Sequence, residues 1–206
     1  MKTLTILMVA VTCFCSANAA IANLQDCDSA MSAYDELNVR LHCDVVEIVE
    51  AAEQGDARAQ IMLAELYLEG GFGVDRDSVA AFRWYTAAAE QGDTDALLGL
   101  SRLYGSGNGV TQDLGAEFRL IIAAAKQGNN RAQFKLGLFY HVRFDEYVLA
   151  YLWITIAAMN GNVEALERKI FIERYPIEHR LSQADLVAVP ELARNCIASG
   201  YEVCEN

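Results

Sequence analysis

Small and apolar residues recur along this chain in steps of four, the spacing that aligns side chains along one face of an α-helix. The recurrence is tied to four glycines that lie 37, 36 and 33 residues apart: Gly55, Gly92, Gly128 and Gly161. An alanine follows each glycine by four residues, and in three copies a leucine follows by eight and a tyrosine by twelve: Ala59, Ala96, Ala132 and Ala165; Leu63, Leu100 and Leu136; Tyr67, Tyr104 and Tyr140. The pattern predicts one helix after each glycine and an internal repeat.

A turn and a second helix are predicted to complete each copy. Residues 70–74 and 105–110 are rich in glycine, which supplies the positive φ angles of a sharp reversal. Asp77 and Asp113 then stand where a second helix begins, because an acidic side chain favours the positive end of the helix dipole. Alanine triplets in these helices allow close packing between neighbours. Each copy is therefore predicted to be a helix–turn–helix whose apolar face is covered by adjacent copies.

The third copy departs from this pattern at its turn. Residues 141–146 form a shorter segment without glycine, whereas the aromatic and alanine positions of the second helix are retained after it. We still predict a complete helix pair there. The predicted repeats are 55–91, 92–127 and 128–160.

The two ends of the array are predicted to be helical caps. Residues 20–54 form the N-terminal cap, in which residues 44–54 resemble a second helix. Residues 162–206 form the C-terminal capping helices, of which the last opens at Ser182. Pro190 is expected to bend or restart that helix, because proline lacks the backbone N–H that a helix interior requires.

The motifs of these copies resemble a known repeat. The order A-x3-L-x3-Y, G-x-G-V-x2-D and W-Y-x2-A-A-x2-G is similar to the Sel1-like repeat, a relative of the tetratricopeptide repeat. In the first copy it is carried by Ala59, Leu63, Tyr67, Gly71, Gly73, Val74, Asp77, Trp84, Tyr85, Ala88, Ala89 and Gly92. The resemblance covers about residues 45–206 and weakens where Leu120 and Ile121 replace the Trp-Tyr pair. It implies an all-α, right-handed α/α solenoid of helix–turn–helix repeats with helical caps.

The N-terminus has the pattern of a secretory signal peptide over residues 1–19. A lysine precedes an apolar run at residues 4–15, and Ala17-Asn18-Ala19 offers small residues for cleavage. The run is too short to span a bilayer as an anchor, so no stable membrane insertion is expected. Lipidation at a leader cysteine is disfavoured by the residues before it. The mature chain is therefore expected in the bacterial periplasm or secreted.

Cysteine usage agrees with export. Two of the six cysteines fall in the leader, and Cys27, Cys43, Cys196 and Cys204 remain. An even set in an exported chain suggests disulfides, and four cysteines allow three pairings. We favour the local pairs, Cys27 with Cys43 and Cys196 with Cys204, and the alternative is free buried thiols. The short gap between the last two is also similar to disulfide-bridged helix pairs of cysteine-rich relatives.

No constellation of catalytic, cofactor-binding or metal-ligating residues is evident. The formal charge of −12 is spread along the chain and leaves no basic stripe for nucleic acid. His42, His141 and His179 have no partner at metal-ligand spacing, and neither Gly-x-Ser-x-Gly nor Ser-x-x-Lys occurs. The glycines at 105–109 follow a predicted helix and lack the lysine of a phosphate loop. We therefore predict no enzyme and no cofactor.

A row of positions on the first helices is the candidate for binding. Two repeat offsets define it, and they are occupied by Ile61, Leu98 and Phe134, and by Glu65, Arg102 and Leu138. On the concave side of a solenoid such a row could hold a peptide or a partner helix. The alternative is that its apolar members pack between copies.

We predict a monomeric, exported scaffold for protein–protein interaction in the periplasm. The alternatives are a cell-wall or β-lactam hydrolase and a secreted effector that binds host proteins.

Overall fold

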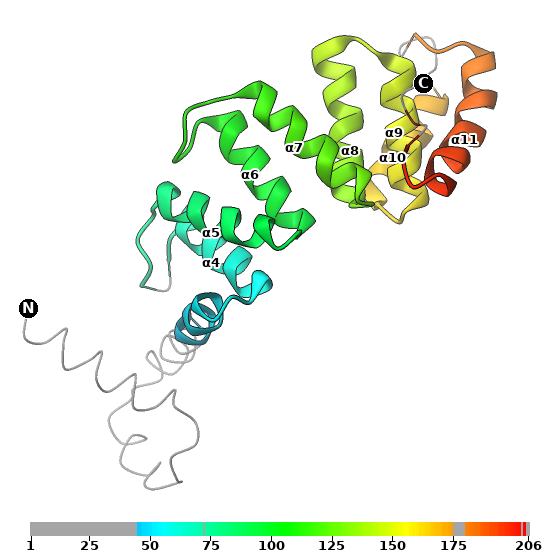
Figure 1. The fold of residues 1–206 in the computed structure, drawn as a ribbon. Helices are drawn as coiled ribbons and strands as arrows, with labels where there is room; N and C mark the ends of the chain where they lie inside the picture. The colour runs from blue at the N-terminus through cyan, green and yellow to red at the C-terminus, as the bar shows by residue number, and fades with distance from the viewer. Residues whose placement is uncertain (1–44, 72, 175–179, 203, 205–206) are drawn as a thin grey trace, which may run out of the picture. The chain divides into compact units, whose positions relative to one another are not determined.

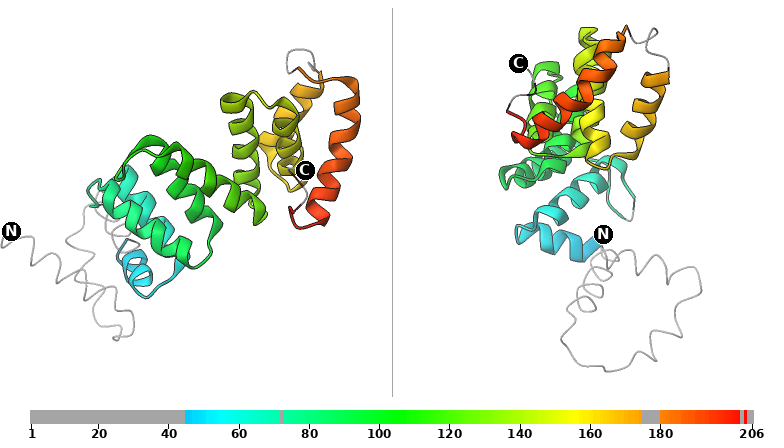
Figure 2. Two further views of the ribbon diagram at one scale, coloured as in Figure 1. Left: turned by 45° about the horizontal axis from the view of Figure 1, so that its top comes forward. Right: turned by 90° about the vertical axis from the view of Figure 1, so that its right-hand side faces the viewer.

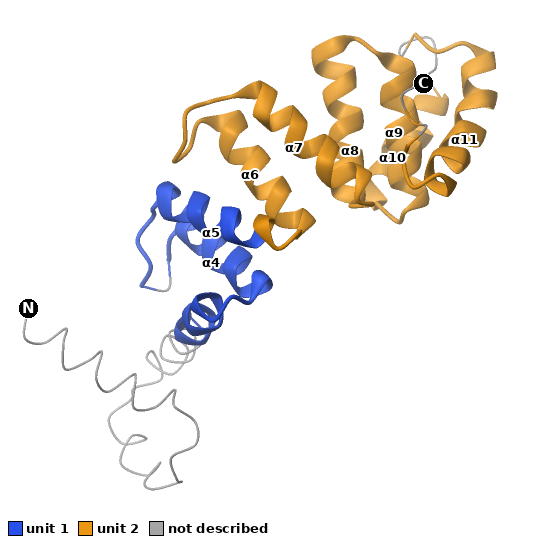
Figure 3. Cartoon of the chain, in the orientation of Figure 1, with its two compact units in different colours: residues 1–88 blue, residues 89–206 orange. Residues whose placement is uncertain are grey.

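The described part of the chain is built from helices (Figure 1). The computed structural model describes residues 45–71, 73–174, 180–202 and 204. In these residues the only β-type pairing is an isolated bridge between Gly71 and Val74. The chain divides into two compact units, residues 1–88 and 89–206, which are described separately below (Figure 3). The predicted leader, residues 1–19, and the N-terminal cap up to residue 44 lie outside the described residues.

In the described residues of the first unit, three helical segments pack around a small apolar core. Residues 45–53 are helical and precede α4 (Ala57–Glu69), and α5 (Ser78–Glu90) follows the turn. Ala52, Ala59 and Leu63 are buried together, and Tyr67 and Trp84 pack against them. The repeat positions identified in the sequence thus form the core of this unit.

Acidic caps begin the helices of the first unit where the sequence places them. The amide of Ala59 donates to Oδ1 of Asp56 over 2.7 Å, and the amides of Val79 and Ala80 donate to Oδ1 of Asp77. Each carboxylate satisfies N–H groups that a helix leaves without intrahelical partners. The expected start of the second helix at Asp77 is confirmed.

In its described residues the second unit begins with two helix pairs, and two further helices follow them. Figure 2 shows the ribbon from two further sides. The elements are α6 (Thr94–Ser106), α7 (Leu114–Lys126), α8 (Asn130–Phe139), the π-helix η1 (Tyr140–Phe144), α9 (Tyr147–Met159), α10 (Val163–Arg174) and α11 (Gln183–Ala198). Along the chain each helix from α6 to α9 packs on the next, and α11 packs back on α9. Asp93, Asp113, Asn129 and Asn162 cap α6, α7, α8 and α10 through their side chains.

Helix α9 is the centre of the second unit. All residues from Ala150 to Ala157 are buried, so the helix has no solvent-facing stripe along this stretch. Such a helix needs partners on every side. It has them in α8, α10 and α11, and the indole of Trp153 stacks on the ring of Tyr201 with 6.4 Å between centroids.

The turn of the third copy is a π-helix. In the second copy α6 ends at Gly107, whose φ of 75° is the left-handed conformation expected of a helix-ending glycine. In the third copy η1 continues directly from α8 and ends at Asp145, which adopts a φ of 56° without being a glycine. The sequence predicted a shorter turn there but not its π-helical form.

The predicted restart at Pro190 is wrong, because α11 is one continuous helix with Pro190 inside it. Proline removes only one hydrogen bond of the helix. Val189, Ala193 and Cys196 are buried on either side of it and hold the flanking turns in place. A capping box between Ser182 and Asp185 starts the helix as predicted.

Among the described helices, none has the length and apolar character needed to cross a bilayer.

Candidate functional site

The apolar members of the predicted row are half-buried. Leu98 and Phe134 pack against the core of the second unit, and Ile61 is half-buried in the first. Packing between helices, the alternative interpretation of these positions, therefore describes Leu98 and Phe134. Leu98 and Phe134 are therefore only partly accessible to a binding partner.

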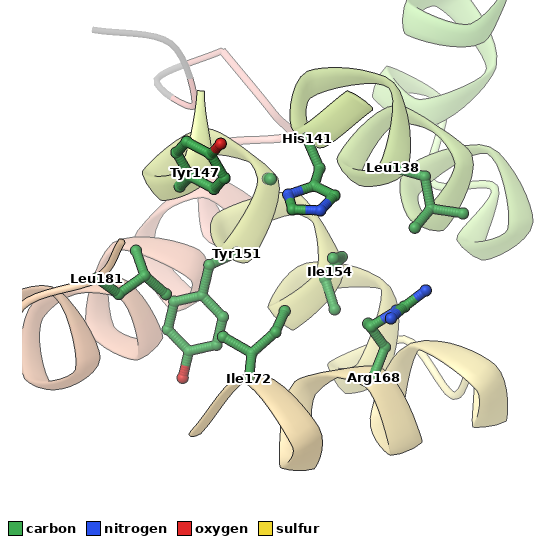
Figure 4. Close-up of a pocket in the computed structure, with 9 residues that line it drawn as sticks. Leu138, His141, Tyr147, Tyr151, Ile154, Arg168, Ile172 and Leu181 are labelled. Atoms are coloured by element: carbon green, nitrogen blue, oxygen red, sulfur yellow. The ribbon is translucent and has the colours of Figure 1, made fainter. Parts of the chain in front are cut away.

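The second offset of the row is more exposed. Glu65 and Arg102 are exposed on α4 and α6, whereas Leu138 is half-buried near the end of α8. Leu138 also lines a hollow that opens between α8 and α10 (Figure 4). Leu138 is therefore a member of the predicted row that lines a hollow in the second unit.

The hollow is apolar at its base and polar at its rim. Its lining residues come from α8, η1, α9, α10 and the segment before α11: Leu138, His141, Tyr147, Ala150, Tyr151, Ile154, Arg168, Ile172 and Leu181. Figure 4 shows His141 above the base, Arg168 beside Ile154, and Tyr147 and Tyr151 on the opposite wall. Its volume of about 20 Å³ holds roughly one water. This is far less than the several hundred Å³ of a small-molecule site, and it suits contact with a protein surface.

Cationic and aromatic groups meet at one side of the hollow. The rings of His141 and Tyr147 meet edge to face with 5.4 Å between centroids. The guanidinium of Arg180 lies 5.2 Å from the centre of the Tyr147 ring, within the range of a cation–π contact. Arg168 is exposed on the opposite side of the hollow, beside Ile154. Arginines therefore border the hollow on two sides, in a chain whose formal charge is −12.

Hydrogen bonds to Glu173 hold the wall of the hollow that Tyr151 forms. The Tyr151 hydroxyl donates to Oε1 of Glu173 over 2.7 Å, and Nζ of Lys169 donates to the same oxygen. Burial and this bond to Glu173 raise the pKa of Tyr151 well above its ordinary range. Partial burial alone would raise the pKa of Glu173, but the bonds from Lys169 and Tyr151 outweigh it and lower that pKa. The Glu173 carboxylate therefore stays ionised over the physiological range, and the Tyr151 hydroxyl stays protonated.

A second polar group joins three helices of the same unit. Nζ of Lys135 on α8 lies 3.4 Å from Oε1 of Glu117 on α7 and donates to Oγ of Ser101 on α6 over 2.9 Å. Desolvation lowers the pKa of Lys135, and the neighbouring Glu117 opposes that change. The group crosses from the second copy to the third, so it fixes one first helix against another.

Asparagines also link consecutive copies of the second unit, and the sequence analysis did not find them. Nδ2 of Asn129 donates to Thr94 and Asp95 at the start of α6, while its Oδ1 caps α8. An aspartate at this position would cap the helix but could not donate backwards. The sequence does show this difference, because the residue after Gly128 and after Gly161 is Asn, whereas the residue after Gly55 and after Gly92 is Asp.

A buried glutamine repeats between the first and third copies. Nε2 of Gln60 donates to the carbonyl of Ala52, and Nε2 of Gln133 donates to the carbonyl of Ala125. In each case the side chain lies five residues after the glycine and satisfies a carbonyl of the preceding second helix. The second copy has Leu97 at this position, so the glutamine does not recur in consecutive copies and was not recognised as part of the repeat.

The cysteines are placed as follows. Cys196 and Cys204 form a disulfide with 5.0 Å between their Cα atoms, one of the two local pairs favoured from the sequence. Cys27 and Cys43 lie outside the described residues, as do His42 and His179. In the part of the chain that the structure describes, no three side chains of His, Cys, Asp or Glu are grouped as a metal ion would require.

The Sel1 repeat family matches three consecutive segments, residues 57–93, 94–129 and 130–162, which together are just over half of the chain. The chain belongs to the Sel1 repeat family. The three matched segments begin and end two residues after the predicted repeats. Proteins built from Sel1 repeats generally act as scaffolds for protein–protein interaction.

Solved structures of Sel1 repeat proteins resemble this chain. A Sel1 repeat protein from Oxalobacter formigenes is 34% identical, with a TM-score of 0.51, over 61% of this chain and 96% of that one. A protective antigen of uropathogenic Escherichia coli strains with an SLR fold is 23% identical, with a TM-score of 0.45, over 84% of this chain and 44% of that one. A search of curated proteins found no significant match. This Sel1 repeat chain is thus an all-α repeat solenoid.

Proposed function

We propose that this Sel1 repeat chain is an exported scaffold that holds a protein partner at the hollow between α8 and α10, without catalysis of its own. The observation that carries the proposal is the hollow itself. Leu138, a row position selected from the sequence alone, forms its wall together with Arg168 and Ile172 of the next first helix. The second helix α9 supplies the base of the hollow through Ala150 and Ile154, and part of one wall through Tyr151.

The chemistry of the hollow indicates what the partner presents. An apolar side chain can cover Leu138 and Ile154, because these groups offer dispersion contacts and little competing polarity. Acidic groups beside that side chain would face Arg168, which lines the hollow, and Arg180, which lies over the ring of Tyr147. Such charges set orientation and association rate more than affinity. The proposed partner is therefore a protein segment with an apolar anchor flanked by acidic residues.

The proposed location rests on the predicted leader. A signal peptide at residues 1–19 would direct the chain to the periplasm, where the Cys196–Cys204 disulfide is stable. The proposal places the partner in the same compartment.

The test compares two charge reversals of the same kind. Arg168→Glu changes the rim of the hollow, and Arg194→Glu changes an exposed arginine of α11 that does not line it. Each variant is crosslinked in intact cell envelopes, and bound proteins are identified by mass spectrometry. We expect a specific partner of the wild type to be lost at least tenfold with Arg168→Glu and retained with Arg194→Glu. Equal recovery with both variants would contradict the assignment of the site.

The absence of catalysis is tested separately. Incubation of the purified chain with a fluorescent penicillin should leave no covalent label. A labelled side chain would instead support the hydrolase alternative.

A further inference from the structure

The end of helix α11 begins like the end of a second helix of the repeat and then departs from it. The amide of Tyr201 donates to the carbonyl five residues earlier, as the amide of Asn129 does after α7. Asn129 has a φ of −66° and caps the next helix, whereas Tyr201 has a φ of 70°. A bulky side chain rarely adopts this left-handed backbone, and it persists only where the surrounding structure enforces it.

The side chain of Tyr201 lies where α7, α8 and α9 meet. Its ring stacks on the indole of Trp153 with 6.4 Å between centroids, and its hydroxyl accepts a hydrogen bond from Nδ2 of Asn160 over 3.0 Å. The same Nδ2 donates to Oε1 of Gln133 over 2.8 Å, and Gln133 bonds to a carbonyl of α7. A Cβ on Gly128 would lie 3.6 Å from the Tyr201 hydroxyl. Tyr201 thus ends a chain of hydrogen bonds that links the second and third copies.

The Cys196–Cys204 disulfide ties the chain together on either side of Tyr201. Cys196 is fully buried, and Cys204 is only 3% exposed. Disulfide exchange requires a thiolate to reach one of the two sulfurs, so a reductant acts only after this loop has opened. Each feature holds the backbone in the form that the other needs. The disulfide and the packed Tyr201 ring therefore stabilise one another.

We propose that Tyr201 and the Cys196–Cys204 disulfide form a redox-dependent clasp, which holds the third copy against the second only once the disulfide has formed. In the reduced chain Tyr201 leaves its site and the helices stay folded. Closing the clasp transfers two electrons from the two thiols to an acceptor disulfide, which leaves as two thiols carrying the two protons. The clasp is independent of the partner proposed above, because neither Tyr201 nor the two cysteines line the hollow.

The first experiment follows the indole that Tyr201 covers. The sequence has two tryptophans, so Trp84→Phe leaves Trp153 as the only one. Oxidised and dithiothreitol-reduced forms of this mature chain are compared by fluorescence and circular dichroism. We expect reduction to shift the emission to longer wavelength without loss of helix, because water reaches an indole that was fully buried. Unchanged emission, or a loss of helix with it, overturns the proposal.

A control assigns the change to this disulfide. Replacing Cys196 and Cys204 by alanine in the same chain should give the shifted emission without reductant, and dithiothreitol should then have no further effect. A response to reductant that persists in this variant would come from other cysteines and would contradict the clasp.

The second experiment measures how fast dithiothreitol opens the disulfide, by alkylation of the freed thiols and mass spectrometry. Tyr201→Ala removes the stacked ring, and Glu202→Ala changes the exposed next residue of the same loop. We expect Tyr201→Ala to speed reduction by about tenfold or more, within the usual range of coupling between two linked sites, and Glu202→Ala to match the wild type. Tyr201→Phe should lie between them, because it keeps the stack and loses the bond to Asn160. Equal rates for Tyr201→Ala and wild type would contradict the proposal.

Hydrogen exchange tests the contact between the two copies. We expect reduction to raise exchange at residues 128–133 and 158–162, which adjoin the Tyr201 site, and to leave α6 unchanged. An equal rise throughout the second unit would show general destabilisation and would overturn the clasp.

Discussion

The second and third copies of the repeat share their helix pairing, but they differ in the form of the turn and in how far the second helix is buried. In the second copy α7 buries only Ile121, Ala124 and Ala125, and the turn before it is formed by glycines. In the third copy all residues of α9 from Ala150 to Ala157 are buried, and a π-helix replaces the glycine turn. The repeat residues therefore determine how the two helices of a copy pack, whereas the turn and the burial of the second helix differ between copies.

The hollow lies where the third copy departs from the repeat. His141 belongs to the π-helix, and Tyr147 begins the helix that follows it. A π-helical segment widens a helix locally and is common at functional sites. The residues that match the repeat most closely, such as Ala132 and Leu136, are buried in the core. The residues of the proposed binding site and the residues of the repeat consensus are thus different ones.

The largest expected effect concerns α11, which packs on α9 of the third copy. Replacing Cys196 and Cys204 together by alanine removes the cross-link at the end of α11. Closing a loop of this size contributes about 2–3 kcal/mol in the chain-entropy model. Chemical denaturation should show a loss of that size, and hydrogen exchange should rise in α9 and α11 more than in α6 and α7. Equal loss of protection in both helix pairs would contradict the difference between the copies.

The next effect compares one repeat position in two copies. Gly137 in the third copy and Ser101 in the second both lie nine residues after their glycine. Gly137→Ala brings a Cβ to 3.0 Å from the carbonyl oxygen of Ala150, and we expect it to destabilise the fold by about 2 kcal/mol. Ser101→Ala removes the hydrogen bond that Oγ accepts from Lys135 and the one that it donates to the carbonyl of Leu98, at a cost of about 1 kcal/mol. Urea denaturation of both variants measures the difference, and a stabilised Gly137→Ala would show that the helices are not in close contact.

A smaller effect distinguishes the two turns. Gly107→Ala places a Cβ at a φ of 75°, and we expect a loss of about 1 kcal/mol. Asp145→Gly relieves the same conformation in the third copy, where Asp145 has a φ of 56°. We expect a change within about 0.5 kcal/mol, because the gain in conformation offsets the lost bond from Tyr147. Thermal unfolding checks both, and equal losses would mean that the two turns are equivalent.

The smallest effect is the pH dependence of the α11 cap. Hydrogen bonds from the side chain and the amide of Ser182 lower the pKa of Asp185 in the folded chain. The stabilisation is therefore present above the ordinary aspartate pKa of about 3.9 and is lost as the pH falls through the lowered value. Asp185→Asn should remove this part of the acid sensitivity. Identical unfolding curves of variant and wild type between pH 2 and about 5 would contradict the role of the cap.

The fold could be predicted because its determinants are local and repeated. Ala59, Leu63 and Tyr67 recur at fixed offsets, and Asp77 and Asp113 mark helix starts that the structure confirms. The π-helix could not be predicted, since no sequence pattern distinguishes it from another short turn. The continuity of α11 through Pro190 depends on packing by distant residues, which local preference does not include.

The candidate site was predicted in part. Leu138 was selected by its repeat offset, but Arg168 and His141 reach the hollow only through the packing of α10 and η1 on α9. The row also included Leu98 and Phe134, which are largely packing residues, because one offset does not tell a core-facing from a solvent-facing apolar side chain. The links made by Asn129 and Gln133 depend on partners more than 30 and eight residues away.

The central claim is that the third copy binds a protein at the hollow. The most direct measurement places a photo-crosslinking amino acid at Leu138, and in a second strain at Val79, which is 48% exposed on α5. Both strains are irradiated as intact cells, and adducts are identified by mass spectrometry. The account predicts one specific protein adduct from position 138 that Arg168→Glu abolishes, and none of it from position 79. The same adducts from both positions, or no adduct from position 138, would contradict it.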